Sequence, residues 1–152
     1  MMIFAFALAL QPADRLPLAD PASSEASVLA PINEAFRALE AQDSAALLRV
    51  VDPDGRVTAV GKLPDGTAAR RSRSWTEYAS KMRPGHGFKE RIINPMIEVD
   101  GDVALVWAPF TIEVGGKIVS CGTDHFDMVR QGGAWKIMNI TFSTMSTGCL
   151  GQ

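Results

Sequence analysis

Three glycine-containing corners in the C-terminal half constrain the fold of this chain most strongly. Asp100-Gly101, Gly115-Gly116 and Gly132-Gly133 each separate two runs rich in apolar and β-branched residues. Glycine readily adopts the positive φ angles that two-residue hairpin turns require. We therefore predict an antiparallel meander of four strands. The predicted strands are residues 88–99, 102–114, 117–130 and 134–146.

The N-terminal half instead shows apolar residues at helical spacing. The stretch VLAPINEAFRALEAQD predicts a helix with Pro31 at or near its first turn, because a proline ring blocks a hydrogen bond in a helix interior. Asp43 is a suitable N-cap for a second helix over SAALLRVV. That helix is expected to stop at Asp52-Pro53, since the residue before a proline disfavours the helical conformation.

A strand pair and a third helix connect these two halves. Residues 56–73 are expected to form two strands around the turn Pro64-Asp65-Gly66. Ser74 and Glu77 then form a capping box, in which each side chain satisfies the other's backbone amide, and open a helix to about Met82. Helices followed by a long meander indicate an α+β fold, with a curved antiparallel sheet wrapped around three N-terminal helices.

Composition excludes several classes of protein. The 152 residues suit one domain, and 47% hydrophobic with 21% charged residues supports a packed core. A net charge of -2 argues against nucleic-acid binding, which needs a basic surface. The basic run at residues 70–73 is interpreted as a solvated strand edge. His86 and His125 have no acidic residues at ligand spacing, so we expect no metal site and no cofactor.

The first residues differ from the rest of the chain. MMIFAFALAL is apolar but, at about ten residues, too short to span a membrane. The small residues of Ala7-Leu8-Ala9 suit a signal-peptidase site. We predict a signal-like segment and linker over 1–23, a folded domain over 24–152 and export from the cytoplasm. The alternative is a cytoplasmic protein with a wrongly assigned start.

Cys121 and Cys149 are the two cysteines of the chain. An exported protein could join them in a disulfide that fixes the C-terminal tail. Two buried thiols are the alternative. The spacing of the two cysteines does not support a zinc or redox motif, because it is not the CxxC spacing.

The corners also predict which residues share a face of the sheet. If each corner is a two-residue loop, the flanking residues pair directly and fix the register of both strands. A one-residue bulge would exchange the faces beyond it. The predicted cross-strand pairs are Asn94 with Trp107, Trp107 with Asp124, Asp124 with Thr141, and Phe126 with Asn139.

This register predicts a small-molecule pocket on one face. Its polar side chains lie beside an aromatic residue in otherwise apolar surroundings, the composition typical of ligand sites. Asp124 is the candidate general base, with a pKa raised by burial, and the single tyrosine, Tyr78, is a candidate hydrogen-bond donor. Alternatively, Asp124 is a structural carboxylate bonded within the sheet. The predicted ligand-binding residues are Trp107, Asp124, Asn94, Asn139, Thr141, Phe126 and Tyr78.

The opposite face is predicted to be a dimer interface. It carries many apolar residues, and three helices can cover only one face of the sheet well. His125 points to this face, since neighbouring residues of a strand alternate sides, so it does not form a dyad with Asp124. A homodimer through the outer face of the sheet is the expected assembly.

Three stretches resemble a known superfamily: VLAPINEAFRALEAQDSAALLRVV, SWTEYASKM and GTDHFDMVRQGGAWKIMNITFS. Over residues 26–146, the order of helices and strands resembles the nuclear-transport-factor-2-like superfamily. The sequence is most similar to its putative lumazine-binding and SnoaL-like branches. The resemblance implies a cystatin-like cone with an apolar pocket at its open end and frequent homodimers. The fold hosts isomerases, cyclases, dehydratases and non-enzymatic domains, so it does not name a reaction.

Three hypotheses for function follow. The favoured one is a domain that binds a small apolar or aromatic molecule without catalysis. The second is a cofactor-independent isomerase, dehydratase or cyclase of the ketosteroid-isomerase or SnoaL type, with Asp124 as general base. The third is a dimeric interaction module whose interior is filled by Phe36, Met82 or Phe88. An open cavity that contains Asp124 would favour the first two hypotheses, and a filled one the third.

Overall fold

The computed structural model describes residues 21–62, 66–149 and 151. The predicted leader at residues 1–20 lies outside this range, so export and the start of the domain stay predictions. Three helices and seven strands form in the described residues. They are α1 (Pro21–Ala41), α2 (Ser44–Val50), β1 (Val51–Lys62), β2 (Ala68–Ser74), α3 (Trp75–Ala79), β3 (Lys89–Ile92), β4 (Met96–Asp100), β5 (Val103–Val114), β6 (Lys117–Gln131) and β7 (Ala134–Ser143).

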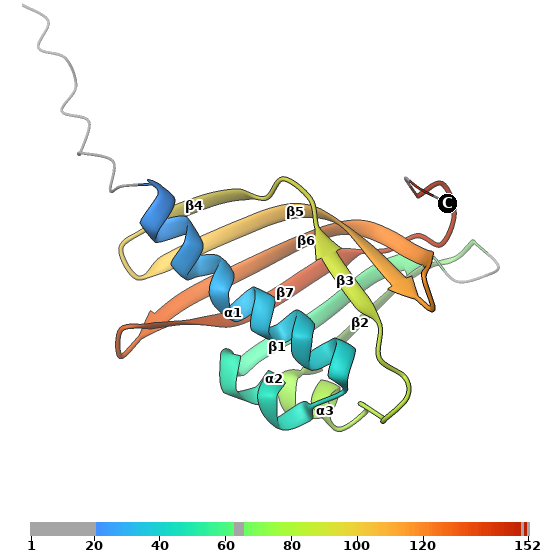
Figure 1. The fold of residues 1–152 in the computed structure, drawn as a ribbon, viewed down its shortest axis with the longest axis horizontal. Coiled ribbons are helices and arrows are strands. Elements are labelled where there is room, and N and C mark those ends of the chain that lie inside the picture. Colours follow the sequence, from blue (N-terminus) through green and yellow to red (C-terminus); the bar gives the residue numbers. More distant parts are fainter. Residues whose placement is uncertain (1–20, 63–65, 150, 152) are drawn as a thin grey trace, which may run out of the picture.

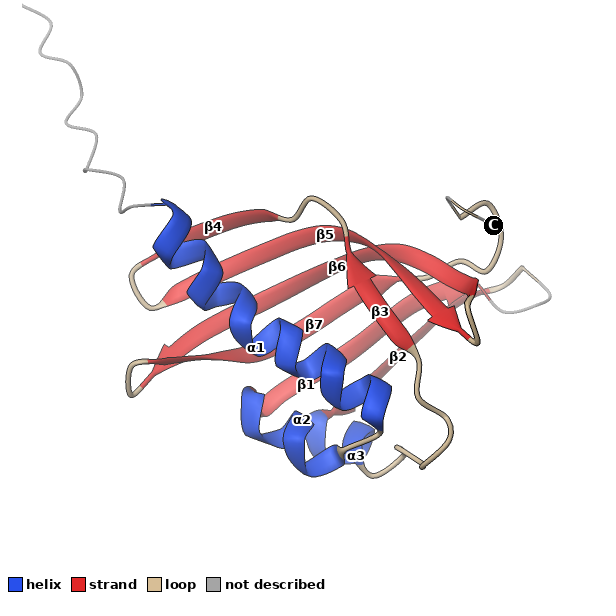
Figure 2. Cartoon of the chain, in the orientation of Figure 1, coloured by secondary structure: helices blue, strands red, loops and turns tan. Residues whose placement is uncertain are grey.

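The strands form one curved sheet with the helices on one of its faces (Figures 1 and 2). The strand order is β2-β1-β7-β6-β5-β3, and β4 pairs with the other half of β5. Neighbours are antiparallel except β1 and β7, which run parallel. We call the face under α1 the inner face and the opposite one the outer face. The predicted α+β fold with a wrapped sheet is confirmed.

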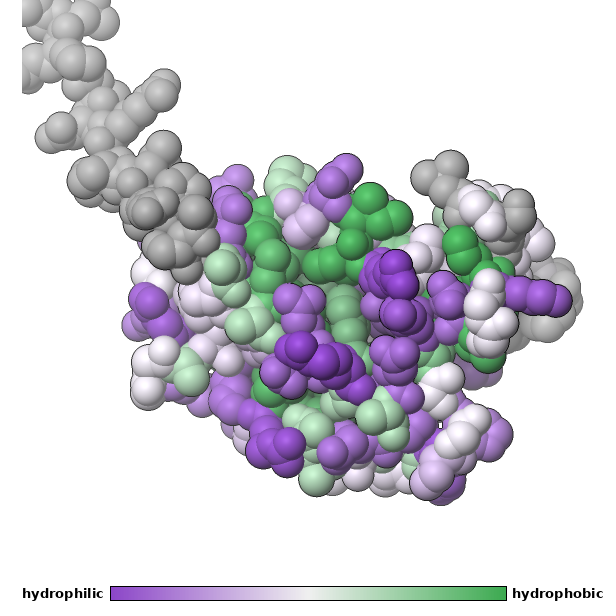
Figure 3. All heavy atoms as spheres, in the orientation of Figure 1, coloured by the Kyte–Doolittle hydropathy of each residue, from purple (hydrophilic) through white to green (hydrophobic). Residues whose placement is uncertain are grey.

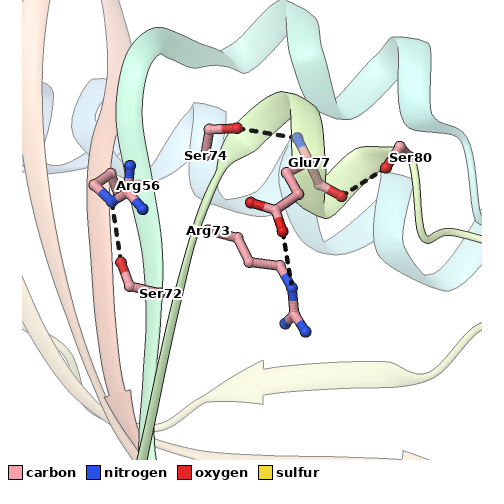
Figure 4. A network of polar contacts seen from close by, with 6 residues as sticks. All are labelled: Arg56, Ser72, Arg73, Ser74, Glu77 and Ser80. Carbon is pink, nitrogen blue, oxygen red and sulfur yellow. Dashed lines mark hydrogen bonds and ion pairs between the residues drawn. The ribbon is translucent and has the colours of Figure 1, made fainter.

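Capping residues start the helices where the sequence indicates. The Asp43 side chain accepts a hydrogen bond from the Ala46 amide at 2.9 Å. Ser74 Oγ accepts one from the Glu77 amide at 3.1 Å (Figure 4). Each bond satisfies an amide that has no partner within its helix. The third helix is shorter than predicted, because it ends at Ala79 and turns continue the chain to Met82.

The prediction for Pro31 is wrong. Pro31 lies inside the 21 residues of α1 and is buried there. A proline in a helix interior costs about 3 kcal/mol. The packing of α1 outweighs this cost, since Val28 and Ile32 on either side of the proline are fully buried against the sheet. Tertiary contacts therefore override the local preference at this position.

The core lies between α1 and the inner face of the sheet. One row of paired residues runs across four strands and packs against the apolar side of α1. This row consists of Val57, Ile140, Phe126 and Val106. The opposing side chains of α1 are Val28, Ile32, Ala35 and Leu39. Alternate residues of β5 are therefore buried and exposed along most of its length.

The predicted strand at residues 88–99 is broken into β3 and β4. Residues 93–95 separate the two, and Asn94 adopts a positive φ of 45° just before Pro95. The next turn is also displaced: Asp100 pairs with Val103, so that Gly101 and Asp102 form the corner. As a result Trp107 faces Met96 and not Asn94.

Two further register shifts change the composition of the faces. Val114 pairs with Lys117 as predicted, but Val119 is an extra residue in β6 beyond that corner, and Trp107 then faces His125. In the same way Met138 is an extra residue in β7, which sets Phe142 opposite Asp124. Each one-residue bulge reverses the side to which the following residues point. The predicted pairs of Asp124 with Trp107 and Thr141 are therefore wrong.

The bulge at Met138 is held by Trp75. The buried indole Nε1 of Trp75 donates a hydrogen bond to the Met138 carbonyl oxygen at 2.9 Å. Gly55 of β1 approaches the same carbonyl so closely that an added Cβ would lie 1.6 Å from its oxygen. A residue with a side chain does not fit at this point without a shift of the backbone. The helix α3, through its first residue, thus fixes the register of the last strand pair.

A disulfide joins Cys121 of β6 to Cys149 near the C-terminus. It closes a loop across a sequence separation of 28 residues. A loop of this size contributes about 3 to 4 kcal/mol to stability in the chain-entropy model. The bond agrees with an oxidising compartment. None of the helices in the described residues is long and apolar enough to cross a membrane.

We predict that Trp75→Phe lowers the free energy of unfolding by about 1–3 kcal/mol, because the Met138 carbonyl loses its donor. Urea denaturation measures the change. Trp107→Phe, which alters a half-exposed indole on the outer face, is the matched control and should change stability by less than about 0.5 kcal/mol. Equal effects of the two substitutions would show that the indole hydrogen bond does not hold the bulge.

Candidate functional site

The most unusual group of the inner face is the carboxyl of Asp124. Asp124 is 0% exposed, and the residues paired with it across the sheet are Ala108 and Phe142. Phe126, two residues further along β6, points to the same face and is also buried. The carboxyl group therefore lies among apolar side chains on three sides.

Neither carboxyl oxygen of Asp124 has a hydrogen-bond partner among the described residues. Leaving a buried polar group without a partner costs roughly 1–3 kcal/mol, and a buried charge costs more. Burial raises the pKa of Asp124 from 3.8 to about 7. The predicted direction of this shift is thus confirmed, whereas the alternative of a carboxylate bonded within the sheet is not what the structure shows.

A second acidic group, Glu90 of β3, lies near Asp124. Glu90 is partly buried and pairs with Ile112 of β5. Burial raises its pKa well above 4.5, and the negative charge of Asp124 raises it further. Because two neighbouring carboxylates repel each other in apolar surroundings, we infer that the pair carries at most one negative charge near neutral pH.

Tyr78 of α3 completes this polar group. Burial is the main cause that raises its pKa to about 12, and the charge of Glu90 adds to the effect. The Tyr78 ring contacts Trp75 edge-on, with ring centroids 6.3 Å apart. The hydroxyl therefore stays protonated over the physiological pH range and is available as a hydrogen-bond donor. We call Tyr78, Glu90 and Asp124 the acid cluster.

A cavity of about 60 Å³ lies inside the cone beside this cluster. It is walled by apolar side chains from the helices and from the inner face. Glu90 and Tyr78 belong to its wall, whereas Asp124 is not among its lining residues and is linked to it through the charge interaction with Glu90. Its remaining lining residues are Ala35, Phe36, Leu39, Leu47, Val57, Trp75, Phe88, Ile112, Phe126, Ile137, Ile140 and Phe142.

Four of the predicted site residues lie away from this cavity. Trp107 is 48% exposed on the outer face, and Asn139 and Thr141 share that face because the bulges reverse the predicted parity. Asn94 is exposed at the break between β3 and β4. The structure brings Asp124, Phe126 and Tyr78 together on the inner side and separates them from the other four.

The outer-face residues form their own polar network. His125 Nε2 lies 3.5 Å from Asp127 Oδ1, and the Trp107 ring lies 6.0 Å from that of His125. Asn139 Nδ2 donates to Asp127 Oδ2 at 3.2 Å, while its Oδ1 accepts from the Arg56 amide at 3.0 Å. As predicted, His125 and Asp124 point to opposite faces. Asn139 therefore acts in the sheet and not in the cavity.

Glu90 was not among the predicted site residues. The available signal was the alternation in FKERI, where Phe88, Glu90 and Ile92 occupy every second position. Because alternate residues of a strand share a face, a glutamate between two apolar residues belongs on the apolar side. In the described part of the chain, no three His, Cys, Asp or Glu side chains gather as metal ligands would.

The sequence matches one family model over residues 23–143, that of the putative lumazine-binding proteins. The chain belongs to this family. The match covers α1 except its first two residues, every strand and the whole acid cluster. No curated protein matches the chain.

Solved structures show the same fold at low sequence identity. A cystatin-like protein of unknown function from Nostoc punctiforme has a TM-score of 0.66 at 12% identity, over 83% of this chain and 94% of that one. The β subunit of a putative aromatic-ring-hydroxylating dioxygenase from Novosphingobium aromaticivorans has a TM-score of 0.65 at 13% identity, over 85% of this chain and 95% of that one. A putative NTF2-like dehydratase from Streptomyces avermitilis has a TM-score of 0.60 at 18% identity, over 82% of this chain and 98% of that one. The chain thus has the NTF2-like, cystatin-like fold.

The raised pKa of Asp124 predicts that stability falls as pH rises. The folded protein holds this proton up to about pH 7, while the unfolded chain releases it from pH 3.8 upward. The protonated carboxyl therefore stabilises the folded protein fully below pH 3.8. This stabilisation, roughly 2–4 kcal/mol, is lost as the pH rises through about 7. Asp124→Asn should reduce this slope to the part that the raised pKa of Glu90 contributes, and the variant should be more stable than wild type at pH 8.

Urea denaturation between pH 4 and pH 8 measures the slope. Asp100→Asn, at an exposed position of β4, is the control and should keep the wild-type profile. If the stability of the Asp124→Asn variant depends on pH in the same way as that of the wild type does, the Asp124 carboxyl ionises as freely in the folded as in the unfolded state.

Proposed function

We propose that the cone binds a small organic molecule in its apolar interior, with the acid cluster as the polar anchor. The observation that carries this proposal is the carboxyl of Asp124, which is fully buried without a hydrogen-bond partner among the described residues and interacts with Glu90 in the cavity wall. A ligand that supplies a hydrogen bond to the acid cluster would remove part of that cost on binding. The family description, putative lumazine-binding, supports a small-molecule ligand.

The size of the cavity sets a condition on binding. Pockets for drug-sized ligands occupy roughly 300–1,000 Å³, whereas this cavity holds about 60 Å³. Phe36 and Phe88 are both in its wall, and the Phe36 ring packs edge-on against Phe126 at 6.2 Å. Phe36 and Phe88 are only partly buried, so both side chains reach the surface of the protein. A ligand larger than a few atoms therefore requires an aromatic side chain to move.

Phenol and indole are suitable neutral probes of this proposal. We predict that both shift the ¹⁵N amide signals of Phe88, Glu90 and Phe126 on binding. Ile112→Phe, which adds bulk opposite Glu90, should weaken binding at least about tenfold, because overfilling a packed interior excludes the ligand. Val60→Phe adds similar bulk at an exposed site that does not line the cavity and is the control. Absence of any shift in the wild-type protein would overturn the proposal and favour an interaction module with a filled interior.

Proton transfer is the second candidate function. A carboxyl with a pKa of about 7 gives and takes protons readily at neutral pH, as a general acid–base requires. Tyr78 and a protonated Glu90 are donors that could stabilise an oxyanion. One similar structure is named a putative dehydratase. An Asp124→Asn variant that binds a substrate normally but does not turn it over would distinguish catalysis from binding alone.

We also propose that two copies associate through their outer faces. This face exposes an apolar group that no helix covers, which consists of Met96, Val103, Leu105 and Trp107. An exposed group of this kind on a sheet face is typical of interaction sites. The face differs from the one predicted, since Val106, Phe110 and Ile140 are buried in the core instead.

Sedimentation velocity over a range of concentrations tests the dimer. We predict that Trp107→Asp yields a monomer with an unchanged far-UV spectrum, because a charge at the centre of the apolar group opposes its burial. Val114→Asp is the control, since Val114 is equally exposed, at 48%, but lies at the β5–β6 corner. A monomeric wild-type protein at high concentration would exclude the association.

A further inference from the structure

A second, more open cavity adjoins the one inside the cone. It has a volume of about 260 Å³ and shares three wall residues with the inner cavity: Leu39, Tyr78 and Phe88. Its other lining residues come from the end of α1, from β2 and from the segment after α3. They are Gln42, Arg73, Lys81, Met82 and His86. We call this cavity the mouth, because only shared side chains separate it from the interior.

The rim of the mouth is tied to the end of α1. Gln42 follows that helix with a positive φ of 56°, and its side-chain amide donates to the Leu39 carbonyl at 2.7 Å. The Gln42 Oε1 atom accepts from the Arg83 amide, also at 2.7 Å. Gly87 packs so closely that a Cβ there would lie 1.9 Å from the Glu40 carbonyl oxygen. Residues 83–88 are thus held against α1, which keeps the mouth open at a defined position.

The charge of the mouth is opposite to that of the interior. Arg73, Lys81 and His86 line it, and none of the described residues in its wall is an aspartate or glutamate. The wall of the inner cavity, in contrast, contains Glu90. Tyr78 lies between the two: the charge of Arg73 lowers its pKa, whereas Glu90 raises it. Figure 3 shows hydrophilic and weakly hydrophobic residues side by side on the surface around the helices.

The ion pair of Arg73 leaves this residue available to a ligand. Its Nε atom lies 3.7 Å from Glu77 Oε1, and the terminal nitrogens of the guanidinium point away from Glu77 (Figure 4). Both side chains are substantially exposed, and exposed pairs of this kind contribute less than about 1 kcal/mol. A carboxylate in the mouth can therefore compete with Glu77 for the guanidinium, which binds carboxylates in a two-pronged geometry.

We propose that the ligand of the cone is a small organic acid in its anionic form. Its ring occupies the inner cavity beside Glu90, and its carboxylate lies in the mouth at Arg73 and Lys81. This inference rests on the proposed binding function and adds the chemical class of the ligand. The arrangement is self-consistent, because a nearby anion keeps Glu90 protonated, and a neutral carboxyl can donate a hydrogen bond to a ring acceptor.

Matched pairs of acid and primary amide test the chemical class. The probes are benzoate and benzamide, indole-3-carboxylate and its amide, and 2-naphthoate and its amide, titrated at pH 7.5 and followed by ¹⁵N shifts. We expect each ring that binds to bind roughly tenfold more tightly as its acid, since a charged hydrogen bond is stronger than a neutral one. The double substitution Arg73→Gln, Lys81→Gln should abolish this preference and leave the affinity for the amides unchanged.

The control carries the same change of net charge outside the mouth. Arg70→Gln, Arg91→Gln alters two exposed residues that do not line either cavity, and it should retain the preference for acids. If acids and amides bind equally, with shifts at Phe88 and Glu90, the anionic class is overturned and the binding function stands. If neither form produces shifts, both proposals fail.

Discussion

The position of Asp124 depends on two extra residues, Val119 in β6 and Met138 in β7. Each shifts the register of a strand pair by one, so that Asp124 lies between Ala108 and Phe142 and not between Trp107 and Thr141. A carboxyl group in this position opposes folding, since the surrounding phenylalanines offer it no hydrogen bond. The bulge at Met138 is in turn fixed by the indole of Trp75. The surroundings of the acid cluster thus depend on a contact between α3 and β7 made by Trp75, which also lines the cavity.

The same register divides the polar residues of the sheet between two surfaces. The inner face carries the acid cluster with its raised pKa values, while on the outer face Asp127 lies 3.5 Å from His125 and accepts a hydrogen bond from Asn139. Perturbed carboxyls beside a cavity are typical of functional sites, whereas a satisfied network in a sheet is typical of structure or of an interface. This division is the reason to assign ligand binding to the interior and association to the outer face.

Local signals in the sequence predict the elements of the fold but not the faces of its strands. Asp43 and Ser74 act as caps, and Gly115-Gly116 and Gly132-Gly133 turn the chain, because each of these functions depends on a few neighbouring residues. A bulge has no comparable signature, since it is stabilised by distant partners such as Trp75. For that reason Trp107, Asn139 and Thr141 were assigned to the wrong side.

The remaining differences have the same origin in tertiary contacts. Pro31 is tolerated within α1 because the helix is packed against the sheet. The break at Asn94 interrupts a stretch whose sequence predicts one continuous strand. Glu90, in contrast, could have been recognised from alternation alone. The sequence therefore predicts the architecture and Asp124 as a buried acid, and the partners of that acid follow only from the three-dimensional register.

The central claim is that the buried carboxyl of Asp124 keeps its proton far above the usual range of an aspartate and is half-ionised only at about pH 7. A ¹³C NMR titration of the aspartate carboxyl carbons, with Asp124→Asn to assign the signal, measures this directly in the wild-type protein. The account predicts that this one carboxyl titrates with a midpoint of about pH 7. Titration of the Asp124 signal at about pH 4, as in an unfolded chain, would contradict it.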